Sequence, residues 1–282
     1  MAEIVYPPVI ATARAAFAAI RVRVDEVGGE NIPAHGGAVL ASNHVSYLDF
    51  LFCGLAAQPS KRLVRFMAKK SVFDNKIAGP LMRGMKHIPV DRAAGAGAYS
   101  AALKALTGGE IVGVFPEATV SRSFLLKDFK IGAARMAAEA GVPLVPMIVW
   151  GTQRYWAKNH PRQLTKPKNP VLLRVGEALH PTKDDDPALV TAELKSRMAA
   201  LLEEAIAADP YQSAGPEDTW WLPADRGGTA PTPEDAAVLE KAELEERAAA
   251  YKAQLRVEAE KRVKARAQAK AKAAAKERRA KD

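Results

Sequence analysis

The feature that most constrains the fold is an alternation of short apolar runs with helix-like stretches between residues 21 and 208. The apolar runs have the length and β-branched content of buried strands, and they lie at 21–26, 38–42, 63–68, 87–91, 111–115, 144–149 and 171–175. Segments typical of helices lie at 46–57, 78–84, 99–106, 131–140 and 191–208. This alternation predicts an α/β fold, with a single domain at 21–209 whose largely parallel seven-strand sheet is flanked by helices.

The segment before this domain, residues 1–20, has the pattern of a short amphipathic helix. Pro8 suits the first turn of a helix. The apolar residues that then share one face are Ile10, Ala13, Phe17 and Ile20. Such a helix lies at a membrane interface or packs on its own domain, and the sequence allows both. We expect a membrane-interface helix that docks the enzyme, with the basic tail as an auxiliary tether. No run of about 18 strongly apolar residues is present, so we expect no membrane span.

Two further segments follow the predicted domain. Residues 210–233 are rich in proline and glycine and predict an irregular strap, whose Trp220 and Trp221 either dock on the domain or meet a membrane interface. From residue 234 to 282 we expect a charged tail, helical or disordered. Ten basic and two acidic residues at 261–282 give +8 of the net charge of +9. These residues include no aromatic side chain to stack on a base, so we expect an anionic membrane surface and no nucleic acid as partner.

The cysteine and histidine content limits the chemistry further. Cys53 is the single cysteine, which excludes an internal disulfide and fits a reducing compartment. We see no secretory signal in the first residues, MAEIVYPPVI. No cysteine and histidine cluster has metal-ligand spacing, and no glycine-rich nucleotide loop is present. We therefore expect no metal and no bound cofactor.

The stretch ASNHVSYLDFLF places His44 and Asp49 at the carboxyl end of the predicted strand 38–42. Ser46 suits a helix N-cap, which would put Asp49 at the third helical position, so this carboxylate also has a structural explanation. His44 stands before the cap, where open α/β sheets build their sites. A carboxylate that holds one imidazole nitrogen leaves the other available as a general base.

Four blocks in this order resemble the signatures of the glycerolipid acyltransferase family. Asn43 to Asp49 reads as the NHx4D motif, and the later blocks are MKHIPVDR at 85–92, VFPEATVSR at 114–122 and VPLVPMIVWGT at 142–152. The resemblance covers roughly residues 22–176 and is strongest to the 1-acylglycerol-3-phosphate acyltransferases or a close relative. It implies transfer of a fatty acyl group from acyl-CoA or acyl carrier protein to the free hydroxyl of 1-acylglycerol 3-phosphate. The product would be phosphatidic acid, made at the cytoplasmic face of the cell membrane.

The resemblance also implies roles for individual residues. His44 would be the general base and Asp49 would orient its ring, with no covalent enzyme intermediate, so Cys53 is expected to be a packing residue. Glu117 would hydrogen-bond the acceptor or brace Arg92. Other residues expected at the substrate are Lys70, Arg92, Thr119, Ser121 and Arg122.

The sequence departs from the family pattern at three positions. Ala118 replaces the usual glycine, Val120 stands where many members have arginine, and Lys86 occupies an often small position. Arg92 and Arg122 are therefore the candidates for the cation that meets the substrate phosphate.

Two alternatives remain at this point. One is an enzyme of the same superfamily with another acceptor, such as glycerol 3-phosphate, a different lysophospholipid or a glycolipid. The other is a catalytically silent membrane adaptor with the same fold, against which the intact His44 and Asp49 argue.

Overall fold

A computed structural model describes residues 3–91, 95–215, 217–246 and 248–253 of the 282-residue chain. The chain divides into two compact units, Met1–Thr232 and Pro233–Asp282. In the second unit the described residues 233–246 and 248–253 are helical. The basic tail predicted at 261–282 lies outside the described residues. The first unit contains the sheet, the predicted strap and the N-terminal helix.

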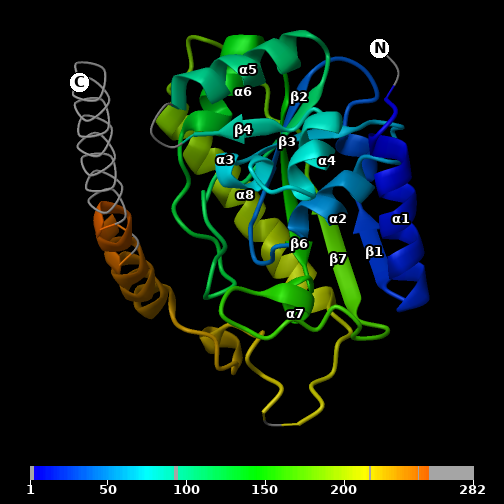
Figure 1. Cartoon of the computed structure of the whole chain (residues 1–282), viewed down its shortest axis with the longest axis vertical. Coiled ribbons are helices and arrows are strands. Elements are labelled where there is room, and N and C mark those ends of the chain that lie inside the picture. The colour runs from blue at the N-terminus through cyan, green and yellow to red at the C-terminus, as the bar shows by residue number, and fades with distance from the viewer. Residues whose placement is uncertain (1–2, 92–94, 216, 247, 254–282) are drawn as a thin grey trace, which may run out of the picture. The chain divides into compact units, whose positions relative to one another are not determined.

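A seven-stranded sheet in the order β1-β7-β6-β2-β5-β3-β4 forms the centre of the first unit (Figure 1). Every pairing is parallel except β6 with β7. The strands are β1 (Arg23–Val27), β2 (Ala38–Ser42), β3 (Val64–Lys69), β4 (Ile88–Val90), β5 (Ile111–Val114), β6 (Leu144–Trp150) and β7 (Pro170–Val175). The predicted α/β fold, with its largely parallel sheet, is confirmed.

Helices cover both faces of this sheet, which is why its central strands β2, β5 and β6 are buried at every position. One face packs against α5 (Gly95–Thr107), α6 (Gly132–Ala140) and α8 (Pro187–Ala208). The other face packs against α2 (Asp49–Ala56), which contributes Phe52 and the fully buried Cys53. Burial raises the pKa of the Cys53 thiol, as expected for a packing residue. The remaining helices are α1 (Tyr6–Ala19), α3 (Lys70–Phe73), α4 (Ala78–Gly84) and α7 (Gln153–Trp156), with 3-10 turns at Gly29–Asn31 and Ala224–Arg226.

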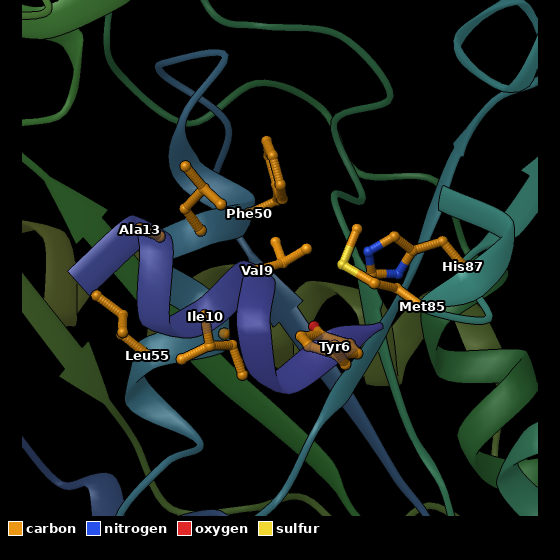
Figure 2. Close-up of a pocket in the computed structure, with 10 residues that line it drawn as sticks. Tyr6, Val9, Ile10, Ala13, Phe50, Leu55, Met85 and His87 are labelled. Atoms are coloured by element: carbon orange, nitrogen blue, oxygen red, sulfur yellow. The ribbon is translucent and has the colours of Figure 1, made fainter. Parts of the chain in front are cut away.

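The apolar face of α1 lies against the domain. The rings of Phe17 and Phe52 stack with their centroids 4.7 Å apart, and the Tyr6 hydroxyl donates to the Val64 carbonyl at 2.8 Å. Figure 2 shows α1 residues turned toward α2, where both helices line a small apolar pocket. α1 therefore packs on the domain through this face, and the membrane-interface role of residues 1–20 stays a prediction. Among the described residues, no helix combines the length and the hydropathy needed to cross a bilayer.

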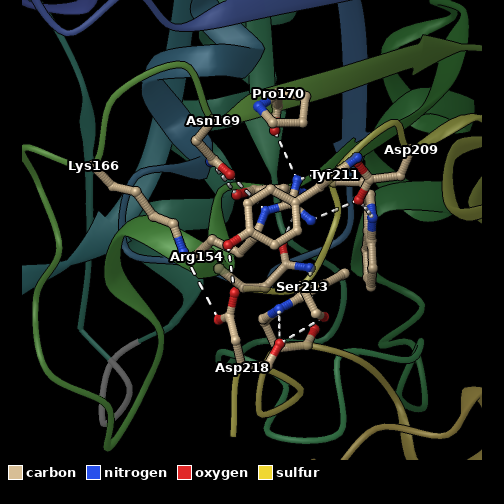
Figure 3. Close-up of polar contacts among 12 residues, drawn as sticks. Arg154, Lys166, Asn169, Pro170, Asp209, Tyr211, Ser213 and Asp218 are labelled. Atoms are coloured by element: carbon tan, nitrogen blue, oxygen red, sulfur yellow. Dashed lines mark hydrogen bonds and ion pairs between the residues drawn. The ribbon is translucent and has the colours of Figure 1, made fainter. Parts of the chain in front are cut away.

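Tyr211 and Trp221 of the strap, together with Asp209 just before it, contact a buried arginine in α7 (Figure 3). Arg154 donates to Asp209 Oδ2 and to Asn169 Oδ1, both at 2.6 Å. Its guanidinium lies over two rings of the strap, 4.4 Å from the centroid of Tyr211 and 4.6 Å from that of Trp221. We call this set of contacts the Arg154 clamp. Trp221 is buried by it, so the docking interpretation of the tryptophan pair holds.

Candidate functional site

The parallel strands bring the motif residues to one edge of the sheet. β2 lies between β5 and β6 and is parallel to both, so the three carboxyl ends meet at the same edge. His44 follows β2, Glu117 follows β5 and Thr152 follows β6. This edge is where open α/β sheets place their ligands.

His44 and Asp49 form a hydrogen-bonded pair at this edge. The distance between His44 Nδ1 and Asp49 Oδ2 is 2.9 Å, and the Asp49 carboxylate is fully buried. The His44 side chain is 19% exposed, and its Nε2 makes no hydrogen bond to the described part of the chain. A buried carboxylate that holds Nδ1 fixes the ring and leaves Nε2 to accept a proton.

Asp49 is held by several donors besides the histidine. Its Oδ2 accepts hydrogen bonds from the Val45 and Ser46 amides, both at 2.8 Å. The helix begins at Asp49 itself, three residues later than the predicted start at Ser46. The N-cap is Leu48, which makes no side-chain capping bond, so the prediction of Ser46 as the N-cap is wrong. The Ser46 hydroxyl instead accepts from the Leu48 amide at 3.1 Å within the turn before the helix. The Asp49 carboxylate therefore holds this turn and the His44 ring at once.

Thr152 donates to the other Asp49 oxygen, Oδ1, at 2.6 Å. This threonine is fully buried and stands directly before α7. Gly151 makes the turn from β6 with φ of 94°, and a Cβ there would lie 2.2 Å from the Pro170 carbonyl oxygen. The tight turn brings the Thr152 hydroxyl under the carboxylate, so both Asp49 oxygens have donors.

The His44 ring and backbone are fixed by residues that follow β5. The ring stacks on Phe115, with centroids 4.1 Å apart and planes 17° apart. The His44 amide donates to Glu117 Oε1 at 2.9 Å, and the Ser121 amide donates to the His44 carbonyl at 2.7 Å. The His44 ring is thus held by stacking on Phe115, and its backbone amide and carbonyl are both held by hydrogen bonds.

Glu117 faces the protein interior. Its second oxygen, Oε2, accepts from the Lys127 amide at 3.3 Å, so both oxygens bond backbone groups. Burial raises the pKa of Glu117 to about 8, against the opposing effect of the two N–H donors. The carboxyl thus braces the loop that carries His44. The contacts of Glu117 with an acceptor glycerol or with Arg92 stay predictions.

The rest of the VFPEATVSR block forms the loop around this brace. Ala118 has φ of 62°, a conformation that glycine adopts freely, which explains why a glycine is usual at this position. Val120, at the position where many members have arginine, is buried. The Thr119 hydroxyl lies 2.5 Å from Lys127 Nζ, and the buried Ser121 hydroxyl donates to the Leu125 carbonyl at 2.8 Å.

The cations predicted to bind the substrate phosphate lie in different environments. Arg122 is half-buried, follows the Ser121 amide that bonds His44, and its guanidinium nitrogens lie 2.5 and 3.2 Å from the Asn159 side-chain amide. Lys70 is exposed and pairs with Asp91 at 3.1 Å. Arg92 lies outside the described residues. The structure therefore brings Arg122 into the same loop cluster as His44 and puts Lys70 in a surface ion pair.

His87, in the second motif block, is a buried packing residue. Its Nδ1 accepts from the Phe66 amide at 3.0 Å, and burial followed by the charge of Arg65 lowers its pKa to about 4. A neutral ring is therefore expected over the physiological range. Among the described residues, no group of three or more histidine, cysteine or carboxylate side chains could hold a metal ion.

Three contributors to the site were not singled out from the sequence. Thr152 and Phe115 lie in the quoted blocks, and their places at strand ends were the available signal. Asn43, quoted only as part of the motif, ties β2 to β6, because its side chain donates to the Val149 carbonyl at 3.0 Å and accepts from the Val149 amide at 2.8 Å.

Comparison with known proteins identifies the family. A model of the family described as "Acyltransferase" matches residues 23–150. A 1-acyl-sn-glycerol-3-phosphate acyltransferase of Bacillus subtilis (strain 168) is 32% identical over 175 residues, covering 62% of this chain and 80% of that protein. This chain belongs to the acyltransferase family. It is therefore an enzyme of the acyltransferase class, as the four motif blocks predicted.

Other acyltransferases extend the comparison. A 1-acyl-sn-glycerol-3-phosphate acyltransferase of Borreliella burgdorferi is 28% identical over 142 residues, which is 49% of this chain and 55% of that protein. The alpha form from Mus musculus is 32% identical over 190 residues, which is 64% of this chain and 65% of that protein. The crystal structure of the 1-acyl-sn-glycerophosphate (LPA) acyltransferase from Thermotoga maritima shares the fold. Its TM-score is 0.61 at 23% identity, over 73% of this chain and 81% of that one.

Proposed function

We propose that this acyltransferase moves a fatty acyl group from an acyl thioester to the free hydroxyl of 1-acylglycerol 3-phosphate, forming phosphatidic acid. The observation that carries the proposal is the His44 ring, held at Nδ1 by a buried carboxylate with Nε2 presented at the carboxyl edge of the sheet. The Bacillus subtilis relative, which bears the name of this activity and is matched over 80% of its length, supports the choice of acceptor.

The chemistry follows from the geometry of this pair. An unperturbed hydroxyl is a weak nucleophile at neutral pH, so a base is needed as it attacks. As the acceptor oxygen bonds to the thioester carbonyl carbon, His44 Nε2 takes the hydroxyl proton. The carbon–sulfur bond then breaks, and the proton passes from Nε2 to the departing thiolate. Asp49 stabilises the imidazolium in between.

The reaction requires no resident cofactor, because the thioester supplies an activated acyl group. Cys53 contributes no nucleophile, since it is fully buried in the core and its thiol pKa is raised. The thiol of the donor is that of coenzyme A or of acyl carrier protein, and both are donors in this proposal.

The acceptor phosphate requires a cation. Arg122 is the described candidate, because its backbone neighbour Ser121 bonds the His44 carbonyl. Arg92 is the second candidate. We also propose that the enzyme meets its lipid acceptor as a peripheral protein at the cytoplasmic face of the membrane.

The test is product analysis with the full-length chain. Purified protein is incubated with lysophosphatidic acid, glycerol 3-phosphate and other lysolipids, each with acyl-CoA or acyl carrier protein, and products are identified by mass spectrometry. We expect phosphatidic acid from lysophosphatidic acid. His44→Ala should lower turnover by roughly 10²–10⁴-fold, whereas the exposed His180→Ala should not change it. Product from another acceptor alone, or near-normal turnover of His44→Ala, would reject the assignment.

A further inference from the structure

Two short helices after β3 expose apolar side chains to solvent. Ile77, the N-cap of α4, is 80% exposed, Leu81 on α4 is 41% exposed, and Val72 on α3 is 38% exposed. Ile77 and Leu81 are four residues apart and Ile77 has right-handed helical backbone angles, so both side chains lie toward one side of α4. We call the surface formed by Val72, Ile77, Leu81, Lys69 and Lys76 the α3–α4 surface.

The exposure of these side chains is built into a well-packed helix pair. Phe73 at the end of α3 is buried, and Arg83 of α4 donates to its carbonyl at 2.7 Å. The two helices approach closely, because a Cβ at Gly79 would lie 2.2 Å from the Phe73 carbonyl oxygen. The Asn75 side chain accepts from the amides of Ile77 and Ala78 at 2.9 and 3.0 Å. Ile77 is therefore fixed at the start of the helix with its side chain in solvent.

The segment that carries these apolar residues has a net positive charge. Between residues 69 and 86 the chain has five basic residues and one acidic residue, Asp74. Lys70 pairs with Asp91 and Lys86 with Glu3. Lys69 and Lys76 are exposed and make no ion pair within the described residues, so their charge is available to an anionic partner.

The place of this surface in the fold connects it with the reaction. α3 begins directly after β3, which runs parallel to β5, and β5 runs parallel to β2. The helix pair therefore leaves the sheet at the same edge as His44. The apolar face of α1 is already occupied by α2 and the core. The α3–α4 pair, in contrast to α1, still exposes apolar side chains, and these lie beside lysines that make no ion pair within the described residues.

We infer that the α3–α4 surface is the membrane dock of this enzyme. Val72, Ile77 and Leu81 enter the interfacial layer of the bilayer while Lys69 and Lys76 contact anionic lipid headgroups. This inference rests on the proposed lipid acceptor, since docking on this edge brings the bilayer to the side where His44 opens. The lysines select an anionic lipid surface as the occupant.

Vesicle binding by full-length variants tests the dock. The double variant Ile77→Glu/Leu81→Glu should lower partitioning onto phosphatidylcholine–phosphatidylglycerol vesicles at least tenfold, at low and at high salt. Lys69→Gln/Lys76→Gln should lose binding only at low salt and only on vesicles that contain phosphatidylglycerol, because salt screens charge. The matched control is Leu189→Glu on α8, which removes another exposed leucine (71% exposed) from a different surface.

Activity separates this inference from the proposed function. With a short-chain lysophosphatidic acid below its critical micelle concentration, Ile77→Glu/Leu81→Glu should turn over like the wild type. With the acceptor in vesicles it should be slower by the loss in binding. Wild-type protein that acylates no lysophosphatidic acid would reject the function, whereas undiminished vesicle binding by the double variant would reject the dock.

Two further outcomes would also overturn the inference. An equal loss of binding in Leu189→Glu would mean that any added charge weakens partitioning. A wild-type dimer that Ile77→Glu/Leu81→Glu converts to a monomer, with unchanged vesicle binding, would assign the surface to a second copy of the chain. Circular dichroism melting of each variant confirms that it is folded.

Discussion

Replacing Thr152 by valine removes one hydrogen bond from the buried side of the catalytic pair and leaves the shape of the side chain almost unchanged. The Thr152 hydroxyl donates to Asp49 Oδ1 at 2.6 Å, and both side chains are fully buried. Oδ2 keeps its three donors, His44 Nδ1 and the amides of Val45 and Ser46. The substitution therefore leaves the contact with the histidine in place and removes the donor that fixes the opposite oxygen.

The size of the effect follows from the type of bond. A hydrogen bond to a charged group contributes about 1.5–3 kcal/mol, and each 1.36 kcal/mol corresponds to a tenfold change in rate. If the bond acts on the orientation of Asp49 during proton transfer, kcat should fall roughly 10- to 100-fold. The Michaelis constants for both substrates should stay near wild type, because Thr152 is buried behind Asp49.

The assay compares three proteins in steady state, with both substrates varied. Thr152→Ser keeps the hydroxyl and should retain most of kcat, whereas Thr152→Val should not. A pH–rate profile is measured for each, because a change in the environment of the His44–Asp49 pair should also move its acidic limb. Thr152→Val with kcat within twofold of wild type, or Thr152→Ser as impaired as Thr152→Val, would refute the positioning role.

Three further substitutions test other parts of the structure. Burial raises the Glu117 pKa from 4.5 to about 8, so its contribution to stability is complete below pH 4.5 and is lost as pH rises through 8; Glu117→Gln should gain in melting temperature relative to wild type between pH 5 and 9, and a pH-independent difference would contradict this. Ala118→Gly should raise the free energy of unfolding by about 0.5–1 kcal/mol in urea, because Ala118 has positive φ; a loss of stability would show that the alanine is not strained. Arg154→Met should cost about 3–5 kcal/mol by leaving Asp209 buried and unpaired, and Asp209→Asn added to it should recover part of that loss in urea unfolding; no recovery would mean that packing dominates.

The strands and the motif edge could be predicted because their signals are local. Apolar runs such as 111–115 and 144–149 have the length and the β-branched content of buried strands, and both form such strands. The helices α3 and α7 have four residues each, which is too short to show a helical period. Neither helix was predicted. The link between Thr152, which precedes α7, and the Arg154 clamp, which α7 carries, was therefore not predicted either.

Side-chain direction was harder to predict than strand position. The hydrogen bond between Thr152 and Asp49 joins residues 103 apart in sequence, and a single sequence does not contain that pairing. Glu117 stands at a strand end like His44, yet it turns inward because two backbone amides are available to it there. The amphipathic pattern of α1 predicted an apolar face without saying which partner would cover it, and the core covers it.

The Arg154 clamp has a consequence for how this enzyme can be divided. The family match ends at residue 150, just before Thr152 and α7. The contacts that hold α7 come from Asp209, Tyr211 and Trp221, far beyond that boundary. A fragment cut at the end of the family match would keep the complete NHx4D motif but lose Thr152, which donates to the Asp49 carboxylate, and the α7 contacts that follow it. A fragment that keeps all of these contacts runs to about Thr232, where the first compact unit ends.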